Sequence, residues 1–142
     1  MADFRNKVIL VTGSTGGIGS TTARRLAEQG ARLVLLDHDA SAVEAFAKEL
    51  GAECITGSGD ISIESTMQSA VKQAIDRFGR IDGAFLNAGM EGRVAAIEKQ
   101  NIEDFDRVLQ VNVRSVFIGL ACLMPLMKEQ QSGSVVITSS AA

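Results

Sequence analysis

Thr12-Gly13-Ser14-Thr15-Gly16-Gly17-Ile18-Gly19 is the stretch of sequence that decides the fold. It follows the apolar run Val8–Val11, which is typical of a buried strand, and it leads into a helical pattern that ends near Gly30. Glycine lets such a loop turn tightly and approach a phosphate without a Cβ in the way. The N-terminus of the next helix offers free N–H groups and a positive dipole end. A glycine cluster alone is a weak signal, but a strand before it and a helix after it are the context that dinucleotide binding requires. The residues predicted to contact a dinucleotide here are Gly13, Ser14, Thr15, Gly17, Ile18 and Gly19.

Strand-like and helical patterns alternate along the whole chain. Such alternation favours a parallel sheet with right-handed crossovers, in which strands buried on both faces read as continuous Val, Ile and Leu. We therefore predict a single α/β domain over residues 1–142, a doubly wound parallel sheet of about five strands with helices on both faces. The predicted strands are Val8–Val11, Leu33–Leu36, Glu53–Thr56, Gly83–Leu86 and Ser134–Thr138.

Two of the predicted helices carry start and stop signals. Ser41 with Glu44 three residues later has the spacing of a capping box, and Gly51 lies where a C-terminal glycine belongs. The next helix is expected to begin near Ser62 and to stop at Gly79.

The helical pattern after Asn101 is apolar on two sides, with a narrow polar face that includes Arg107 and Arg114. A helix of this kind is buried on two sides. One side covers the sheet, so the other needs further chain, another subunit or both, and we predict a homodimer or homotetramer. The stripe expected on the sheet is Phe105, Val108, Leu109, Val113, Val116, Phe117, Leu120, Leu123 and Met127. The stripe expected to face outward is Val111, Ile118, Cys122 and Leu126.

The predicted second strand ends at Asp37, eighteen residues after Gly19. A carboxylate at this place accepts hydrogen bonds from both hydroxyls of an adenosine ribose and repels a 2′-phosphate. Neither Thr15 nor His38 is the Arg or Lys that would neutralise such a phosphate. The sequence therefore favours NAD over NADP as the cofactor; the alternative is that Asp37 only caps a loop.

Composition excludes several other classes of protein. The net charge of −3 argues against nucleic-acid binding, which needs a basic face. We see no apolar run of bilayer length, no secretory signal and no metal-ligand spacing, and thus expect no membrane and no metal. Cys54 and Cys122 are far apart and are interpreted as free thiols of a cytoplasmic protein.

Five motifs in order and spacing resemble those of the short-chain dehydrogenases/reductases, a family of NAD(P)-binding Rossmann-fold oxidoreductases. The motifs are Thr12-Gly13-x-x-x-Gly17-Ile18-Gly19, Asp60-Ile61, Asn87-Ala88-Gly89, Asn112 and Ser139-Ser140.

The resemblance implies roles for two of these motifs at the cofactor. Asp60 would bind the adenine amino group, with Ile61 flanking the ring; the alternative is that Asp60 only begins a helix. Asn87, Ala88 and Gly89 would form the turn after the fourth strand that steadies the sheet and passes the cofactor. Leu86 stands where the family often has a second Asn.

Two of the family's catalytic positions fall within this chain, and they match Asn112 and Ser140. Asn112 would hold a water that links the proton relay to solvent. Its position around the predicted helix lies inside the apolar stripe, so its amide needs partners such as a kinked backbone or a water. The alternative is a core Asn with a purely structural role. Ser140 would orient the substrate oxygen, with Ser139 as the neighbour that could take its place.

The family's catalytic Tyr and Lys lie beyond Ala142, and this chain contains no Tyr at all. We interpret the ending as a cut through a longer chain and expect residues 1–142 alone to be inactive. The resemblance implies hydride transfer between NAD(H) and a small alcohol or ketone. The alternatives are a non-enzymatic dinucleotide sensor and an NADP-linked carbonyl reductase. The segment Met90–Gln100 is expected near the site mouth, where Met90, Glu91 and Arg93 either touch substrate or form a solvated loop.

Overall fold

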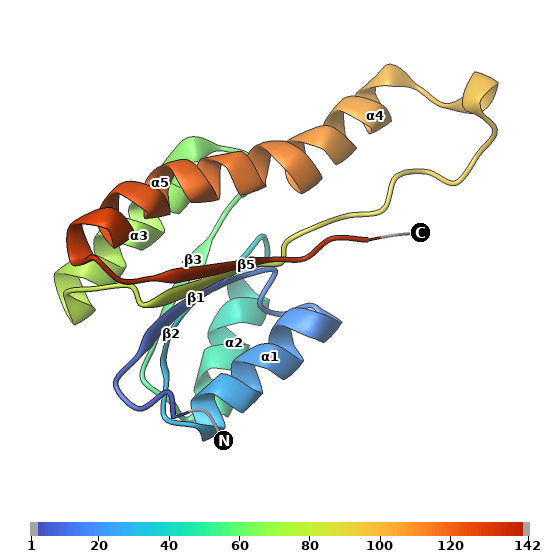
Figure 1. Cartoon of the computed structure of the whole chain (residues 1–142). Coiled ribbons are helices and arrows are strands. Elements are labelled where there is room, and N and C mark those ends of the chain that lie inside the picture. The colour runs from blue at the N-terminus through green and yellow to red at the C-terminus, as the bar shows by residue number, and fades with distance from the viewer. Residues whose placement is uncertain (1–2, 141–142) are drawn as a thin grey trace.

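Five parallel strands form one sheet in the order β3-β2-β1-β4-β5 in the computed structural model, which describes residues 3–140 (Figure 1). From β1 the chain runs outward to β3 and then returns to pair β4 with the other side of β1. The sheet therefore has its topological switch point between β1 and β4, where α/β proteins bind ligands at the carboxyl ends of the strands. The strands are β1 (Val8–Thr12), β2 (Arg32–Asp37), β3 (Cys54–Ser58), β4 (Gly83–Leu86) and β5 (Ser134–Ile137).

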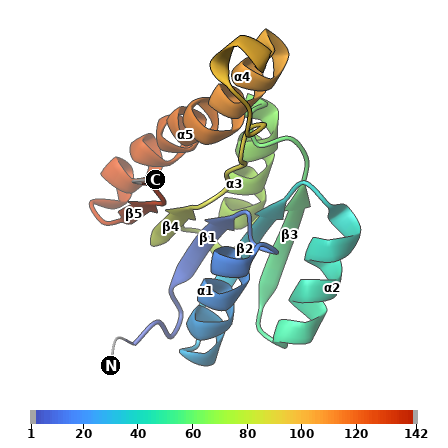
Figure 2. The same ribbon diagram turned by 90° about the vertical axis from the view of Figure 1, so that its right-hand side faces the viewer.

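The helices cover both faces of the sheet, as the doubly wound prediction requires (Figure 2). On one face lie α1 (Gly17–Glu28) and α2 (Ala40–Leu50). On the other lie α3 (Glu64–Phe78) and α5 (Ser115–Gln130). A short 3-10 turn, η1 (Ile97–Lys99), precedes α4 (Ile102–Leu109), and the π-helical segment η2 (Gln110–Arg114) joins α4 to α5.

Alternation along the strands divides the core into two layers. Side chains of a strand point to opposite faces in turn, so Val8 and Leu10 of β1 pack toward α3 and α5. Ile9 and Val11 pack toward α1 and α2. All five residues of β1 are buried, which makes this strand the centre of both layers and fixes the position of the loop that follows it.

The helix ends agree with the predicted stop signals and correct one start signal. Gly51 and Gly79 end α2 and α3 in the left-handed conformation, with φ of 61° and 76°. The capping box at Ser41 is wrong, because Asp39 caps α2: its side chain accepts a hydrogen bond from Ala42 N at 3.0 Å. Ser41 lies inside the helix instead.

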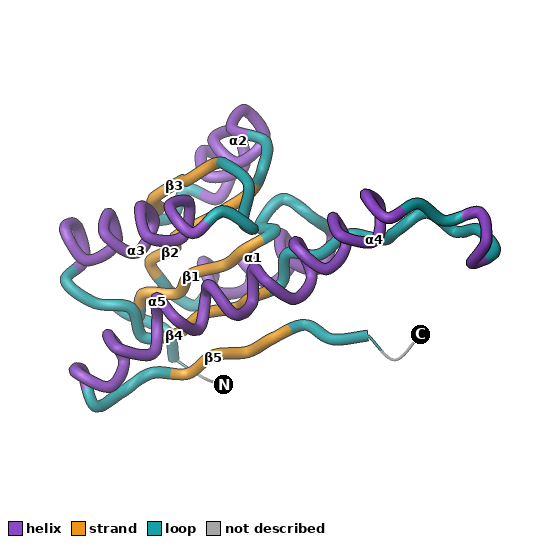
Figure 3. Tube along the Cα trace, turned by 90° about the horizontal axis from the view of Figure 1, so that it is seen from above, coloured by secondary structure: helices purple, strands orange, loops and turns teal. Residues whose placement is uncertain are grey.

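The helix of residues 102–130 is one continuous rod (Figure 3). Of the stripe expected on the sheet, Leu123 and Met127 are buried as predicted. Val111 and Ile118, expected to face outward, are buried. Cys122 and Leu126, expected outward as well, are partly buried against the core. Phe105, expected on the sheet, is 58% exposed. Leu109, Val113 and Phe117 are exposed in the same way.

The π-helical segment η2 explains this difference. A π turn takes in one more residue than an α turn, so it delays the helical phase by about 100° relative to the uninterrupted helix that the prediction assumed. The α5 side that packs into the core is formed by Ile118, Leu123 and Met127.

The helix of residues 102–130 is long and apolar enough to cross a membrane by length and composition. The expectation considered uninterrupted apolar runs, whereas this helix carries a few charges among its apolar residues. In the structure its α5 portion packs on the sheet, where Leu123 is fully buried.

Candidate functional site

A cleft of about 480 Å³ opens at the carboxyl ends of β1, β2 and β4, on the switch point of the sheet. The loops after β1, β2, β3 and β4 contribute its walls, and Arg107 and Val111 of the long helix close one side. Eight of the predicted cofactor residues line this one cleft: Gly13, Thr15, Asp37, Asp60, Ile61, Asn87, Ala88 and Gly89.

Two glycines of the loop after β1 leave no room for a side chain. Gly13 has a φ of 62°, and a Cβ there would lie 3.0 Å from the Cα of Ala88. A Cβ on Gly19 would lie 2.0 Å from the carbonyl oxygen of Gly13, so the loop and the first turn of α1 fold closely onto each other. Gly17 has open space around it at the N-terminus of α1, where the first N–H groups lack partners within the helix.

The remaining predicted loop residues do not line the cleft. Ser14 is fully buried under the loop, and its backbone N–H donates to Leu36 O at 3.1 Å. Its hydroxyl oxygen has no hydrogen-bond partner among the described residues. Gly17, Ile18 and Gly19 form the first turn of α1, and the Ile18 side chain is 62% exposed.

Asp37 is a buried carboxylate fixed by the backbone around it. Its Oδ2 accepts from Thr15 N at 2.9 Å, and its Oδ1 accepts from His38 N at 2.8 Å. The exposed His38 ring also lies beside this carboxylate, with Nδ1 2.8 Å from Oδ1. Burial acts to raise the pKa of Asp37, but the hydrogen bonds from Thr15 and His38 outweigh it and hold the pKa below its ordinary value. An ionised acceptor therefore faces the cleft at the end of β2.

Thr12 and Asn87 join the ends of the central strands. The Thr12 hydroxyl accepts from Asn87 N at 2.9 Å and from Ala88 N at 3.0 Å. Asn87 Oδ1 accepts from the Thr138 hydroxyl at 2.8 Å. These bonds connect the end of β1, the turn after β4 and the residue after β5.

Asp60 is bound both by Ser62 in its own loop and by Arg107 of α4, which is distant in the sequence. Its Oδ1 accepts from Ser62 N at 2.9 Å and from the Ser62 hydroxyl at 2.6 Å. Its Oδ2 accepts from Arg107 Nη1 at 2.8 Å. The Ser62 hydroxyl contributes most to holding the pKa of Asp60 below its ordinary value; partial burial opposes it, and the Ser62 N–H and Arg107 add to it. Asp60 lies ahead of α3, which begins at Glu64, and it is bound from both Ser62 and α4.

Asn112 lies in η2 and binds the backbone beyond the β4 turn. Its Oδ1 accepts from Met90 N at 2.8 Å, and its Nδ2 donates to Met90 O at 2.9 Å. The amide thus finds both partners in the backbone of Met90, in the loop after β4, and not in the backbone of its own helix. Asn112 itself is exposed, because the apolar stripe around it faces away from the core.

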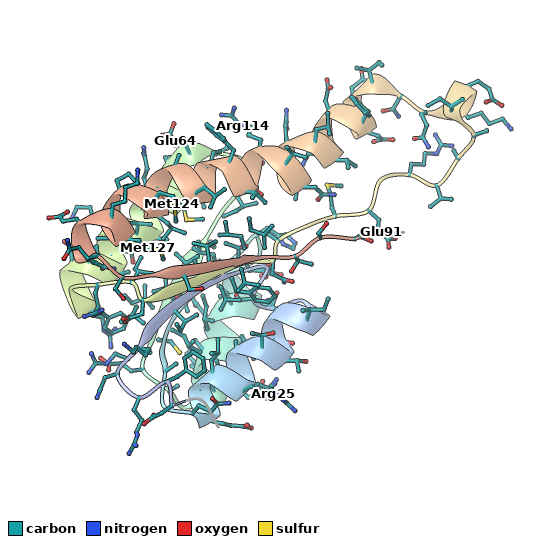
Figure 4. The ribbon with its side chains drawn as sticks, viewed as in Figure 1. Arg25, Glu64, Glu91, Arg114, Met124 and Met127 are labelled. Atoms are coloured by element: carbon teal, nitrogen blue, oxygen red, sulfur yellow. The ribbon has the colours of Figure 1, made fainter. Side chains whose placement is uncertain are left out.

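Ser139 and Ser140 follow β5, are exposed and are not among the residues that line the cleft. Of the segment Met90–Gln100, only Met90 lines the cleft. Glu91 and Arg93 are exposed, which agrees with the solvated-loop alternative, and Glu91 lies on the segment that leads away from the sheet (Figure 4).

Sequence reasoning missed three residues that shape the site: Thr12, Arg107 and Thr138. Thr12 lies inside the glycine motif, where its position before the loop was the available signal. Nothing in the spacing connects Arg107 to Asp60, because the two residues are 47 positions apart. Thr138 was expected only as the end of a strand.

A parallel doubly wound sheet with a glycine loop at its switch point and a buried acid at the end of β2 defines a Rossmann-fold protein. The chain belongs to the short chain dehydrogenase family, whose pattern matches residues 7–142.

Individual relatives agree with this assignment. Levodione reductase of Leifsonia aquatica is 41% identical over 142 residues, which cover 96% of this chain and 53% of that protein. Cyclohexanol dehydrogenase of Acinetobacter sp. (strain SE19) is 35% identical, with 98% of this chain and 57% of that protein covered. The chain spans about half the length of the curated relatives that it matches.

Solved structures show the same fold. The crystal structure of levodione reductase superposes with a TM-score of 0.92 at 41% identity, covering 96% of this chain and 55% of that chain. The structure of NAD+-bound xylitol dehydrogenase gives 0.91 at 38% identity, over 98% of this chain and 55% of that one. A 3-ketoacyl-(acyl-carrier-protein) reductase from Brucella melitensis, complexed with NADH, gives a TM-score of 0.92 at 34% identity. The match covers 97% of this chain and 59% of that chain.

Proposed function

We propose that the full-length protein is an oxidoreductase that transfers a hydride between NAD(H) and an alcohol or ketone. The observation that carries the choice of cofactor is the Asp37 carboxylate, which is buried, lines the cleft at the end of β2 and has a pKa below its ordinary value. A fixed anion at that place accepts from the two ribose hydroxyls of NAD and repels the extra phosphate of NADP. Two similar solved structures hold NAD+ or NADH, in support of the same cofactor.

The shape of the cleft fits a dinucleotide. The close approach of Gly13 and Gly19 keeps side chains out of the space beside the N-terminus of α1, where N–H groups and the helix dipole favour a pyrophosphate. We assign Thr15 and Gly17 to this phosphate end, Asp60 and Ile61 to adenine, and Asn87, Ala88 and Gly89 to the path between β1 and β4. When bound, the nicotinamide ring supplies the hydride donor or acceptor.

Asn112 and Ser140 would serve the chemical step in different ways. Asn112 has both amide atoms bound to Met90, so its side chain positions the segment after Gly89 beside the cleft. Ser140 follows β5 at the same edge of the sheet, and its hydroxyl would orient the substrate oxygen. Proton transfer would come from the Tyr and Lys that the family carries beyond this Ser.

The experiment is a titration of the full-length protein with NADH and with NADPH, followed by an assay of NADH formation with small secondary alcohols. We expect tighter binding of NADH and measurable turnover. Equal affinity for both cofactors would contradict the role of Asp37. Binding of NADH with no turnover of any alcohol or ketone would favour the dinucleotide sensor.

A further inference from the structure

Arg107 of α4 reaches across the cleft to the residue assigned to adenine. Its Nη1 donates to Asp60 Oδ2 at 2.8 Å and lies 3.3 Å from the Ser62 hydroxyl oxygen. Arg107, Asp60 and Ile61 all line the same cleft. The side chains of Arg107 and Asp60 are 43% and 31% exposed, so the pair forms part of a wall that is open to a ligand.

Hydrogen bonds to both oxygens of the Asp60 carboxylate fix its orientation. Ser62 donates twice to Oδ1 from the loop after β3, and Arg107 donates to Oδ2 from α4. An ionised carboxylate only accepts hydrogen bonds, and each oxygen has capacity for more than one donor. Oδ2 can therefore accept from a further N–H in the cleft while Arg107 keeps its orientation.

Arg107 has little to contribute as an ordinary surface ion pair, since partly exposed pairs add little to stability. The helix that carries it, α4, has no buried residue. A second arginine on the same rod, Arg114, donates from Nε to Ser62 O at 3.0 Å. Arg114 thus contacts the same loop through its backbone, whereas Arg107 contacts the Asp60 carboxylate.

We propose that Arg107 is a positioning residue for the adenine end of the cofactor: it fixes the Asp60 carboxylate as the acceptor for the exocyclic amino group of adenine. This inference rests on the proposed dinucleotide function and deepens it, because it assigns the recognition of the base to a pair of residues. Hypoxanthine has a carbonyl oxygen where adenine has the amino group, and its N1 carries a proton. A fixed carboxylate would face that oxygen and repel it, so the Asp60–Arg107 pair discriminates against hypoxanthine.

The test compares NADH with its hypoxanthine analogue, reduced nicotinamide hypoxanthine dinucleotide, on the full-length protein. Dissociation constants are measured by fluorescence titration for the unaltered protein and for Arg107→Met, Arg107→Lys and the matched control Arg114→Met. We expect the unaltered protein to prefer NADH by ~10-fold or more, the ratio that one well-made hydrogen bond supplies. Arg107→Met should lower that preference to within ~3-fold, because Oδ2 then loses the donor that fixes its position.

The other variants distinguish positioning of the Asp60 carboxylate from anchoring of the loop after β3. Arg114→Met should keep the ratio of the two dissociation constants at the value of the unaltered protein, even if it binds both dinucleotides more weakly or more tightly. Arg107→Lys should restore part of the preference, because an ammonium can still donate to Asp60 but lacks the fixed planar geometry of the guanidinium. It also provides a folded comparison if Arg107→Met is unstable.

The outcomes that would overturn the inference are distinct from failure of the proposed function. A protein that binds NADH with an unchanged ratio in Arg107→Met would overturn the role of Arg107. So would an equal loss of preference in Arg114→Met, or a protein with no preference between the two dinucleotides. A protein that binds neither dinucleotide overturns the proposed function itself.

Discussion

Asp37 shows how a single residue acquires its chemistry from the backbone around it. The carboxylate is buried, a situation that by itself favours the neutral form. Thr15 N and His38 N compensate by donating to its two oxygens, so the charge is retained where a ribose would lie. The same N–H groups fix its direction, which is what discrimination between two nearly identical cofactors requires.

Replacing Asp37 with Ala should therefore weaken the preference for NADH over NADPH more than it lowers the stability of the fold. We expect the gap in binding free energy between NADH and NADPH to shrink by ~1–3 kcal/mol, the size of a charge-assisted hydrogen bond plus the lost repulsion. Titration of both cofactors against the full-length protein measures the gap. Asp39→Ala is the matched control: it removes the α2 cap two residues away and should lower thermal stability while leaving the gap intact. An unchanged gap in Asp37→Ala would contradict the assignment.

The glycines of the loop offer a second matched pair. Gly19→Ala places a methyl group 2.0 Å from Gly13 O, and we expect it to lower the free energy of unfolding by at least ~1–3 kcal/mol, the usual cost of overpacking. Gly17→Ala meets nothing within 4 Å, and stability should be unchanged or slightly higher. Thermal or urea denaturation of both variants decides the matter. Equal stability of the two would mean that the loop and α1 are not packed as described.

Ser140 is predicted to act in the chemical step and not in cofactor binding. Ser140→Ala in the full-length protein should lower kcat by ~100-fold or more and leave NADH affinity nearly unchanged, because the lost hydroxyl would contact only the substrate oxygen. Steady-state kinetics and an NADH titration measure the two quantities. Ser139→Ala is the control, and a larger loss of kcat in that variant would move the role to Ser139.

Residues of the site were predictable where a motif lies between recognisable elements. The glycine loop, Asp37 and the turn at Asn87 each follow a predicted strand, so parallel topology alone brings them to one edge of the sheet. Arg107 was not predictable, because its bond to Asp60 depends on how far α4 extends past the strands and on the phase of the helix. Ser14 shows the reverse case: it belongs to the motif, yet its side chain is buried beneath the loop.

At the scale of elements, the long helix decides which apolar surface is exposed. Sequence periodicity identified a helix that is apolar on two sides but could not assign the sides. The π turn at Gln110–Arg114 changes the phase by one residue, and the sequence carries no proline or glycine there to indicate it. Phe105, Leu109, Val113 and Phe117 are consequently exposed, while Val111 and Ile118 are buried.

Exposure of these four apolar side chains supports the predicted homodimer or homotetramer, now through a different face. We expect the full-length protein to sediment as a dimer or tetramer, and Phe117→Glu to shift it toward smaller species, because a charge is costly in a buried interface. Sedimentation velocity at micromolar concentration provides the measurement. Val94→Glu is the control, since Val94 is 97% exposed on the loop before α4. A strictly monomeric unaltered protein would refute this expectation.

At the scale of the molecule, residues 1–142 contain the cleft that we propose holds the cofactor, but no Tyr to act as proton donor. The predicted alternation of strands and helices led to the correct sheet, and the relatives are nearly twice as long. In this chain β5 is an edge strand, with Val136 and Ile137 57% and 44% exposed. An apolar edge of this kind is a template for pairing with another chain.

Residues 1–142 expressed alone should therefore bind NADH weakly, associate through the exposed edge and show no dehydrogenase activity with any alcohol. The chain has no Tyr, and general acid–base help is worth ~10²–10⁴-fold in rate, with positioning adding more. Expression of residues 1–142 beside the full-length protein, with sedimentation, an NADH titration and an activity assay on both, measures all three properties. A monomeric product that oxidises alcohols at nearly the full-length rate would show that the proton-transfer group lies within these 142 residues, and that the assignment of catalysis to a later Tyr and Lys is wrong.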